Sequence, residues 1–446
     1  MAQTTARRRP AITGSTSAAI ASSVEAGVRG GTLPPGTSLP TIRDLADRLK
    51  VSTATVADAY RTLRQRGVIR TYGRRGTRVA ELPPLATSWV PAPPAPGLRN
   101  LADGNPDPKL LPPLGRLLAR AGAEHMLYGD PPKLPELVQV AGEQIRSDGI
   151  EASNLVVVGG AVDGIARVLD AHLSPGDRVG VEDPTFPPLL HLLGSLGLVA
   201  EPLAVDERGP TPDSVEVALT RGVQAIVITP RAQNPTGAVV DAERARQLRT
   251  VLRRDPEVLV IEDDTGGMVT DDPLASAIEP TLQRWAFVRS FSMLLGPDIR
   301  TAVVAADEIT LSRVEGHQLV NRGWVSHILQ RLAFLLLSDQ GTRDRLAEAR
   351  QTYARRRQLL VNALAEAGIT TPSRSGFNVW VPVDQEASAV SALQAAGWAV
   401  AAGEPFRLRS RPGIRITASA LRQADAVALA TDLERALRSR ARTYAG

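Results

Sequence analysis

Two positions that directly follow apolar runs have the chemistry to hold a charged small molecule. Gly160 and Ala161 come after the run that begins at Leu155 and open a predicted helix. The backbone N–H groups and dipole of such a helix start can bind a phosphate. Asp263 ends the run Val258–Asp263, where a buried carboxylate without a partner would be costly. The alternative role for Gly160 and Ala161 is a close packing point between helix and strand.

Composition argues against several other kinds of chemistry. The chain has no cysteine, which removes disulfides, thiolate metal sites and thiol catalysis. Its five histidines include no pair four residues apart, so metal binding has little support. No run approaches the roughly 18 apolar residues of a membrane span, and the amino-terminal arginine cluster has no apolar core behind it. We therefore expect a cytoplasmic protein with neither a metal site nor a membrane partner.

The elements that must position these residues alternate between strand-length apolar runs and helical stretches. Continuous apolar strands separated by helices indicate a buried, mostly parallel sheet. Further along, a helix, three short strands and a last helix predict a smaller α+β lobe. The predicted strands of the sheet are Leu155–Gly160, Arg178–Asp183, Ala225–Pro230, Val258–Asp263, Phe287–Ser292 and Ala302–Asp307. The predicted elements of the smaller lobe are Tyr353–Gly368, Phe377–Val383, Trp398–Ala402, Gly413–Thr417 and Leu421–Arg438.

Across about residues 98–440, short motifs follow one another in an order that resembles the fold-type I aminotransferases, which use pyridoxal 5'-phosphate (PLP). The most diagnostic motif is Asn234-Pro235-Thr236-Gly237. The others are Gly104-Asn105-Pro106-Asp107, Tyr128-Gly129-Asp130-Pro131, Glu182-Asp183-Pro184-Thr185-Phe186, Glu262-Asp263-Asp264 and the segment from Ser290 to Arg300. The resemblance implies an α/β fold-type I domain with the smaller lobe attached.

The resemblance also implies roles for individual residues. The phosphate is expected at Gly160, Ala161, Ser290, Ser292 and Arg300, the ring at Phe186, Asn234 and Asp263, and an effector carboxylate at Arg415. Within the family, the Asn contacts the phenolic oxygen of PLP and the Asp contacts its pyridine nitrogen. Tyr128 is expected at the pocket or the dimer interface. As alternatives, Phe186 could be a core aromatic, and Arg300 and Arg415 could be surface arginines.

One position departs from the family in a way that bears on catalysis. Met293 stands where the resemblance places the lysine that forms the Schiff base with PLP. A thioether has neither a labile proton nor a carbonyl-reactive nitrogen, so we expect no catalytic residue and, if PLP binds at all, non-covalent binding. Only two lysines lie in this part of the chain, Lys109 and Lys133, and either could in principle substitute. Thr265 stands where the family usually has tyrosine.

The amino-terminal segment, residues 1–80, differs in charge from the rest. It holds 14 Lys and Arg against 4 Asp and Glu, whereas the remainder is mildly acidic. This contrast favours a polyanion-binding module, with a solvated basic tail as the alternative. Apolar spacing predicts a helix from Ser15 to Arg29 and two shorter helices that begin near Thr41 and Ser52. Two short β-like runs around residues 73–76 follow, and together these elements predict a winged helix-turn-helix.

This segment, about residues 16–80, resembles the DNA-binding domain of the GntR family. The shared pattern includes Leu39-Pro40-Thr41-Ile42-Arg43 and Val51-Ser52. The resemblance implies that the third helix enters the major groove and that the hairpin forms the wing. The residues expected to contact double-stranded DNA are Arg43, Ser52, Thr53, Thr55, Arg61, Arg74, Arg75 and Gly76. Arg61 could equally be a solvated surface residue.

A proline-rich stretch predicts how the chain is divided. Residues 81–97 carry many prolines and almost no charge, which is typical of an extended linker. We therefore predict a winged helix-turn-helix in residues 1–80, a linker in residues 81–97 and an aminotransferase-like domain for effector binding and dimerisation in residues 98–446.

A GntR-like head joined to an aminotransferase-like body resembles the MocR group of bacterial transcriptional regulators. The resemblance implies a homodimer, arranged head to tail, that binds operator DNA and senses a small-molecule effector, here expected to carry a carboxylate. The body would do so without transamination. The alternatives are a transaminase-like enzyme supplied with PLP or its amine form, and a DNA-binding scaffold whose body only dimerises.

Overall fold

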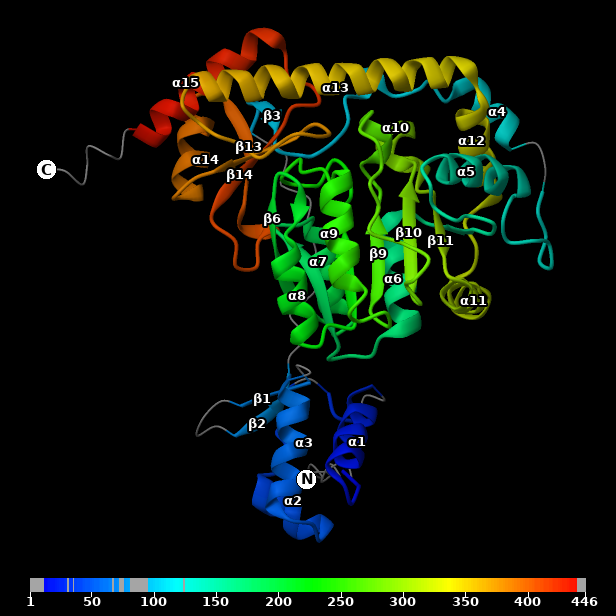
Figure 1. The fold of residues 1–446 in the computed structure, drawn as a ribbon, viewed down its shortest axis with the longest axis vertical. Coiled ribbons are helices and arrows are strands. Elements are labelled where there is room, and N and C mark those ends of the chain that lie inside the picture. The colour runs from blue at the N-terminus through cyan, green and yellow to red at the C-terminus, as the bar shows by residue number, and fades with distance from the viewer. Residues whose placement is uncertain are drawn as a thin grey trace, which may run out of the picture. The chain divides into compact units, whose positions relative to one another are not determined.

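The computed structural model describes residues 12–29, 32–34, 36–65, 68–71, 76–80, 95–122 and 125–438. These residues form two compact units, an amino-terminal one and a larger body (Figure 1). The predicted linker, residues 81–97, lies outside the described residues except for positions 95–97. Among the helices that are described, none is both long enough and apolar enough to cross a membrane.

The amino-terminal unit contains three helices and a two-stranded hairpin. Its elements are α1 (Ser17–Arg29), α2 (Ile42–Leu49), α3 (Thr53–Gln65), β1 (Ile69–Thr71) and β2 (Thr77–Val79). The Thr41 hydroxyl accepts a hydrogen bond from the Asp44 backbone N–H at 3.1 Å and so caps α2. At the other end of α2, Lys50 adopts a left-handed conformation with φ of 56° and turns the chain into α3. The three helices and the hairpin predicted for this segment are therefore confirmed.

The body is built on an eight-stranded sheet with the order β4-β11-β10-β9-β8-β5-β6-β7. Strands β10, β9, β8 and β5 run parallel to their neighbours within that group. However, β11 is antiparallel to both β10 and β4, so the prediction of a mostly parallel sheet holds only for its centre. The strands are β4 (Val156–Val158), β5 (Arg178–Asp183), β6 (Val199–Asp206), β7 (Gly209–Pro210), β8 (Ala225–Ile228), β9 (Leu259–Asp263), β10 (Trp285–Ser290) and β11 (Ala302–Ala306).

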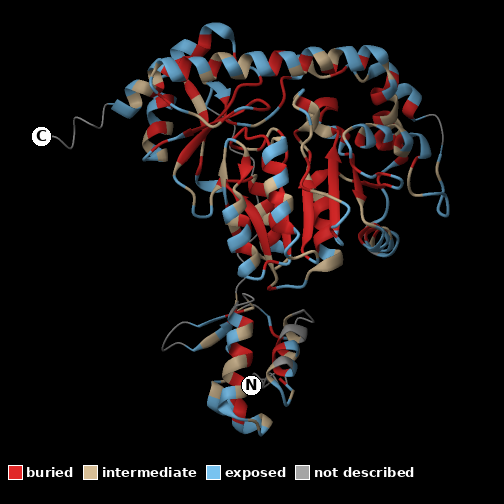
Figure 2. Cartoon of the chain, in the orientation of Figure 1, coloured by how far each residue is buried: buried red, intermediate tan, exposed pale blue. Residues whose placement is uncertain are grey.

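Helices cover both faces of this sheet, and its central strands are almost wholly buried (Figure 2). Continuous apolar runs such as Ala225–Ile228 and the start of Leu259–Asp263 form these strands because neither face meets water. The helices of the large lobe are α4 (Gly115–Ala121), α5 (Pro135–Ser147), α6 (Ala161–His172), α7 (Pro187–Ser195), α8 (Pro212–Thr220), α9 (Ala242–Leu252), α10 (Ser292–Leu295), α11 (Glu308–His317) and α12 (His327–Ser338).

A smaller lobe packs around a four-stranded sheet with the order β12-β14-β13-β3. Its strands are β3 (Arg99–Leu101), β12 (Asn378–Pro382), β13 (Trp398–Ala402) and β14 (Gly413–Thr417), and its helices are α14 (Glu386–Ala395) and α15 (Gln423–Arg438). Strand β3 was not predicted; it comes from the start of the body and adds to the edge of β13, which lies near the other end of the chain.

One long helix, α13 (Gln340–Glu366), extends along the body into the smaller lobe (Figure 1). The sequence predicted only its second part, from Tyr353. Its buried residues Leu346, Ala349 and Tyr353 lie at spacings of three and four, which form a narrow stripe on an otherwise polar helix. Such a stripe is weak in the sequence, and this explains why the first half of the helix was missed.

A buried carboxylate at the end of β5 holds a loop of the smaller lobe. Both oxygens of Asp183 accept hydrogen bonds from this loop, from the backbone N–H groups of Leu408, Arg409 and Ser410 and from the Ser410 hydroxyl, at 2.6–2.8 Å. Two residues later, the Thr185 N–H donates to the Phe406 carbonyl at 2.8 Å. We call this set of contacts the Asp183 anchor.

Candidate functional site

The carboxyl ends of the central parallel strands meet at one edge of the sheet, and most of the predicted ligand residues lie there. Asp263 ends β9, Ser290 ends β10, and Asn234 lies in the loop that follows β8. This edge is where ligands commonly bind in sheets of this kind. The sequence motifs therefore converge in space although they are spread over most of the body.

Two of the residues predicted to hold phosphate, Gly160 and Arg300, lie against each other. Gly160, with φ of 104°, precedes α6, which begins at Ala161. The Arg300 guanidinium lies so close that a Cβ at Gly160 would be 3.0–3.2 Å from its atoms, and its Nη2 donates to the Gly159 carbonyl at 2.8 Å. A side chain at position 160 would displace the guanidinium of Arg300. The contact between the two residues therefore requires the glycine as well as the arginine.

The chain from Ser290 to Met293 differs from the prediction in its secondary structure. The predicted strand extended to Ser292, but β10 ends at Ser290 and Ser292 begins the short helix α10. The Ser290 hydroxyl accepts from the Ser292 N–H at 3.3 Å. The Ser292 hydroxyl is buried and has no hydrogen-bond partner among the described residues. Met293 is partly buried and packs against the main apolar core of the body.

Asp263 is held by Thr265, the residue expected to stand where the family has tyrosine. Thr265 donates to its Oδ1 twice, from the backbone N–H at 3.1 Å and from the hydroxyl. Burial raises the pKa of Asp263 to about 6, and the neighbouring charge of Asp264 acts in the same direction. These contacts orient the Asp263 carboxylate, which the sequence did not indicate.

Arg415 lies in the interior, which disfavours the surface alternative. It is 4% exposed, and its guanidinium donates to Asn234 Oδ1 at 3.2 Å and to the Ala102 carbonyl at 2.5 Å. Its Nε has no partner in the described part of the chain, and its guanidinium carbon is 4.9 Å from the centre of the Phe406 ring. Burial lowers the pKa of Arg415 to about 10. The predicted carboxylate-binding arginine thus contacts Asn234, a predicted ring-binding residue.

Two other predicted residues differ in their exposure. Phe186 is half-buried between β5 and α7. Tyr128 is 95% exposed, and its ring lies 5.7 Å from the ring of Trp324 in an edge-on arrangement. Tyr128 is therefore available at the surface of the body.

Lys133 is already held by other residues. Its ammonium donates to Glu315 at 2.7 Å, to the Asn154 side chain at 2.6 Å and to the Leu155 carbonyl at 3.1 Å. Lys109 is exposed and lies in a short 3-10 turn, Pro108–Leu110. Within the described ranges, neither lysine forms a hydrogen bond or ion pair with the residues predicted to bind PLP.

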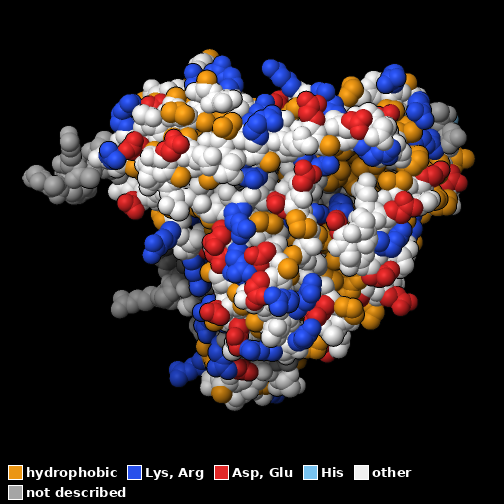
Figure 3. Space-filling view, turned by 45° about the horizontal axis from the view of Figure 1, so that its top comes forward, with side chains coloured by type: hydrophobic (Ala, Val, Ile, Leu, Met, Phe, Trp, Pro, Cys, Tyr) orange, Lys and Arg blue, Asp and Glu red, His pale blue; other side chains and the backbone are white. Residues whose placement is uncertain are grey.

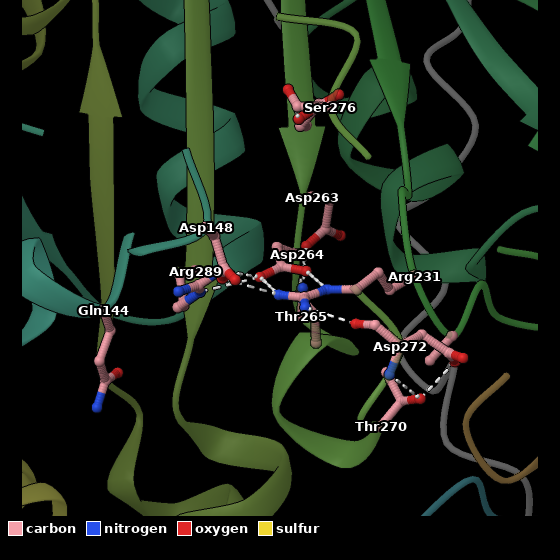
Figure 4. Close-up of polar contacts among 12 residues, drawn as sticks. Gln144, Asp148, Arg231, Asp263, Asp264, Thr265, Thr270, Asp272, Ser276 and Arg289 are labelled. Atoms are coloured by element: carbon pink, nitrogen blue, oxygen red, sulfur yellow. Dashed lines mark hydrogen bonds and ion pairs between the residues drawn. The ribbon is translucent and has the colours of Figure 1, made fainter. Parts of the chain in front are cut away.

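The structure also brings together charged residues that sequence reasoning missed. Asp264, Arg231, Arg289 and Asp148 form a buried ion cluster beside the predicted site, with Asp264 between the two guanidinium groups (Figure 4). The only signal for this cluster in the sequence was that charged residues lie inside or directly after apolar runs. Such a pattern does not show which charged residues pair with each other. No group of three or more metal-binding side chains occurs within the described ranges.

Most of the predicted DNA-binding residues that the structure describes are exposed, and some of them form contacts within the amino-terminal unit. Arg43 and Thr53 are exposed near the starts of α2 and α3. Ser52 caps α3, since its hydroxyl accepts from the Thr55 N–H at 3.1 Å and lies 2.8 Å from the Thr55 hydroxyl. Arg61 pairs with Asp58 one turn away. Gly76 is exposed with φ of 82°, whereas Arg74 and Arg75 lie outside the described residues.

Two further arginines in the hairpin were missed. Arg70 and Arg78 are both exposed and directly opposite each other across β1 and β2. Like charges in such a pair destabilise a hairpin unless an anion lies over them. Their positions therefore favour a role in binding a polyanion, and the sequence could have indicated it once the register of the hairpin was known.

Comparison with known proteins agrees with both units. The family described as "Aminotransferase class I and II" matches residues 99–433, and the family described as "Bacterial regulatory proteins, gntR family" matches residues 16–79. A protein of Salmonella typhimurium strain LT2, the vitamin B6 salvage pathway transcriptional repressor PtsJ, is 40% identical over 429 residues, which is 96% of this chain and 99% of that protein. The chain belongs to this family of HTH-type regulators with an aminotransferase class I and II body. It is a DNA-binding transcriptional regulator.

More distant relatives of the regulator agree with this assignment. The HTH-type pyridoxine biosynthesis transcriptional regulator PdxR of Corynebacterium glutamicum is 27% identical and covers 75% of this chain and 76% of its own. Among solved structures, the kynurenine aminotransferase of Pyrococcus horikoshii superposes with a TM-score of 0.69 at 20% identity, covering 80% of the regulator and 92% of that enzyme. An archaeal alanine:glyoxylate aminotransferase has a TM-score of 0.69 at 23% identity, and the match covers 77% of the regulator and 91% of that enzyme. At these identities the structures establish the aminotransferase fold of the body.

Proposed function

We propose that the regulator senses a small molecule in an aminotransferase-type pocket that performs no amino transfer. The observation that carries this proposal is Met293. It follows Ser292 directly, at the position where aminotransferases need an amine, and a methionine cannot attack a carbonyl or move a proton. Lys133, held by Glu315 and Asn154, is not placed to replace it.

The remaining residues fit PLP held without a covalent bond. The Ser292 hydroxyl, unpartnered among the described residues, and the guanidinium of Arg300 beside Gly160 are suited to a phosphate group. The Asp263 carboxylate, oriented by Thr265, is suited to a pyridine nitrogen. PLP would supply an electrophilic carbonyl when bound, and within the described ranges neither Lys109 nor Lys133 bonds to the residues proposed to hold it. The vitamin B6-related names of PtsJ and PdxR support a B6 vitamer as a ligand of this regulator too.

We assign the carboxylate of a second ligand, the effector, to Arg415. A guanidinium that is buried, lacks a carboxylate partner among the described residues and has a free Nε can exchange the Asn234 and Ala102 acceptors for a carboxylate. Binding of the effector changes DNA affinity only if it binds the competing conformations of the body unequally. The Asp183 anchor ties the lobe that carries Arg415 to the large lobe. In this proposal the competing conformations differ in whether the anchor is formed.

We also propose that the regulator is a homodimer, arranged head to tail. Several large apolar side chains are exposed around Tyr128, and we call them the apolar patch: Leu127, Tyr128, Leu319, Val320 and Trp324. Val320 is 81% exposed, and the contact between the Tyr128 and Trp324 rings joins the two segments. Exposed apolar patches of this kind mark protein interfaces.

The test of the proposed pocket is to restore the missing amine. Met293→Lys is expected to attach PLP covalently, so that borohydride reduction followed by mass spectrometry shows one PLP adduct at residue 293. In the wild type PLP is expected to bind and then dialyse away, without forming an amino-transfer product. Met293→Leu changes the side chain without adding an amine and serves as the control. Met268→Lys, a second control, places a lysine at another half-buried methionine of the same apolar core.

Two outcomes would contradict the proposal. A covalent PLP adduct in the wild type would mean that another lysine serves the pocket. Free loss of PLP from Met293→Lys would mean that the pocket no longer accepts this ligand.

A further inference from the structure

A second cavity lies beside the predicted PLP pocket, on the other side of β9 and β10. It has a volume of about 410 Å³ and is lined by the end of α5, the segment that follows Thr265 and the first turns of α13. In the parallel register of β9 and β10, Asp263 is paired with Val288. Alternation along a strand then places Asp263 and Ser290 on one side, and Asp264 and Arg289 on the other. The two sites are thus back to back, and no predicted ligand residue lines the second one.

The floor of this cavity is the ion cluster. The side chains of Arg231 and Arg289 are only 7% and 4% exposed, and Asp264 is fully buried between them. Arg231 donates to both oxygens of Asp264, at 3.0 and 2.9 Å, and Arg289 donates to one of them, at 2.9 and 2.7 Å (Figure 4). Asp148 joins the cluster through its Oδ2 at 2.5 Å from Arg289. Arginines buried to this degree form a rigid, preorganised set of donors.

The lining of the cavity contains both hydrogen-bond donors and hydrogen-bond acceptors that have no partner among the described residues. Within the described part of the chain, Nη1 of Arg289 and Oδ1 of Asp148 form no hydrogen bond. At the rim, Arg343 donates hydrogen bonds to the Gln340 side chain and the Leu337 carbonyl, and its charge acts on the carboxylate of Asp339, but it forms no direct ion pair with a carboxylate of the described residues. Asp272 uses its Oδ2 for Thr270 and Ser375 and keeps Oδ1 free of described partners. Donors and acceptors therefore face one common volume.

The balance of charge decides which ligand fits. The guanidinium groups at the cavity are Arg231, Arg289, Arg343 and Arg350, and the carboxylates are Asp148, Asp264, Asp271 and Asp272. A phosphate or simple carboxylate would meet the aspartates, and a simple amine would meet the arginines. A molecule that carries both charges satisfies both sets. We propose that this cavity binds a small zwitterion of the amino-acid type, with its carboxylate at Arg343 and Arg289 and its ammonium at Asp148 and Asp272.

A ligand at this site would be coupled to the predicted PLP pocket through two pairs of consecutive residues. Asp264 and Arg289, which bear the ion cluster, are covalently joined to Asp263 and Ser290, which face PLP in the proposed function. A shift of the cluster thus moves the neighbouring pocket, and by linkage PLP changes the affinity for the zwitterion by the same factor. This coupling rests on the proposed PLP site, whereas binding at the cavity does not.

The test uses the full-length regulator carrying Arg415→Gln, which disables the proposed effector site. Glycine, β-alanine and ε-aminocaproate are titrated by calorimetry, with acetate and butylamine as probes of single charge. At least one amino acid is expected to bind saturably, and Arg343→Gln is expected to weaken it about tenfold. Arg355→Gln is the matched control: it lies on the same helix, is exposed, contacts only the Thr352 hydroxyl and does not line the cavity.

Three results would overturn the proposal. The first is no saturable binding by any amino acid, and the second is binding that Arg343→Gln leaves unchanged. The third is acetate or butylamine binding as tightly as the amino acids. An amino acid that binds the wild type but not Arg415→Gln supports the effector site and overturns the cavity proposal, so the two outcomes are distinguishable.

Discussion

At the scale of single residues, the body carries an unusual set of buried acids at the edge of its sheet. Glu182 and Glu262 are 1% and 0% exposed, and neither forms an ion pair with a described residue. Burial raises the pKa of each to about 7, although each accepts hydrogen bonds that act in the opposite direction. Both are therefore partly protonated near neutral pH, and the stability of the body depends on pH in a direction that is unusual for acids.

Glu262→Gln tests this dependence. Because the pKa of Glu262 is raised on folding, the native state holds its proton more tightly, and this stabilisation is lost as pH rises from about 4.5 to about 7. The loss is on the order of 3 kcal/mol. Urea unfolding at pH 5 and pH 8 is expected to show that wild type loses stability relative to Glu262→Gln, which cannot ionise. Glu308→Gln, at an exposed position on α11, is the control. A difference in stability between wild type and Glu262→Gln that is the same at both pH values would refute the assignment.

At the scale of elements, the hairpin β1–β2 is the part of the head whose charge pattern is hardest to explain without a polyanion. Arg70→Ala and Arg78→Ala are each expected to lower the slope of log affinity against log salt concentration by about 0.9, the value for one lost phosphate contact. Both should weaken an operator selected from a random pool and unrelated DNA alike. Thr53→Ala, at the start of α3, should instead weaken the operator selectively. Salt slopes that stay at the wild-type value would remove the hairpin from the interface.

The elements also show what the sequence could and could not predict. Strands β5, β13 and β14 were predicted with their observed bounds because local apolar runs and turns define them. Strand β3 was missed because its partner β13 lies near the other end of the chain and nothing local marks it. In the site, motif order placed Asn234, Asp263 and Arg300 at one sheet edge. The ion cluster could not be predicted, since Arg289 and Asp148 pair across 141 positions, and no pattern in either segment specifies that contact.

At the scale of the whole molecule, the face of the body drawn in Figure 3 does not resemble a nucleic-acid-binding surface. The face of the body drawn in Figure 3 mixes basic and acidic side chains, consistent with its mildly acidic composition. The positive charge is concentrated in the amino-terminal segment, residues 1–80. DNA binding and the proposed ligand sensing are therefore assigned to separate parts of the chain, and the proposed dimer would bring two heads to one operator.

The proposed dimer can be broken at one residue. Val320→Asp introduces a charge into the apolar patch and is expected to convert the dimer into a monomer in analytical ultracentrifugation, with the melting temperature of the body little changed. Val427→Asp is the matched control, since Val427 is also a largely exposed valine, at 63%, but lies on α15. The interface would have to be placed elsewhere if Val320→Asp still sedimented as a dimer or if only Val427→Asp dissociated.

The Asp183 anchor has a mechanical consequence for how the regulator can respond. One carboxylate accepts four hydrogen bonds from three successive residues, and these residues share a loop with Phe406, whose ring lies against Arg415. Because all four bonds end on the two oxygens of one side chain, a displacement of Asp183 from the loop would weaken them together. A ligand that Arg415 binds, as proposed, would release these contacts together if its binding displaced Asp183. At low occupancy by the ligand, we expect a mixture of molecules in which the Asp183 anchor is intact and molecules in which it is released. The proportion of the two would set the transcriptional output.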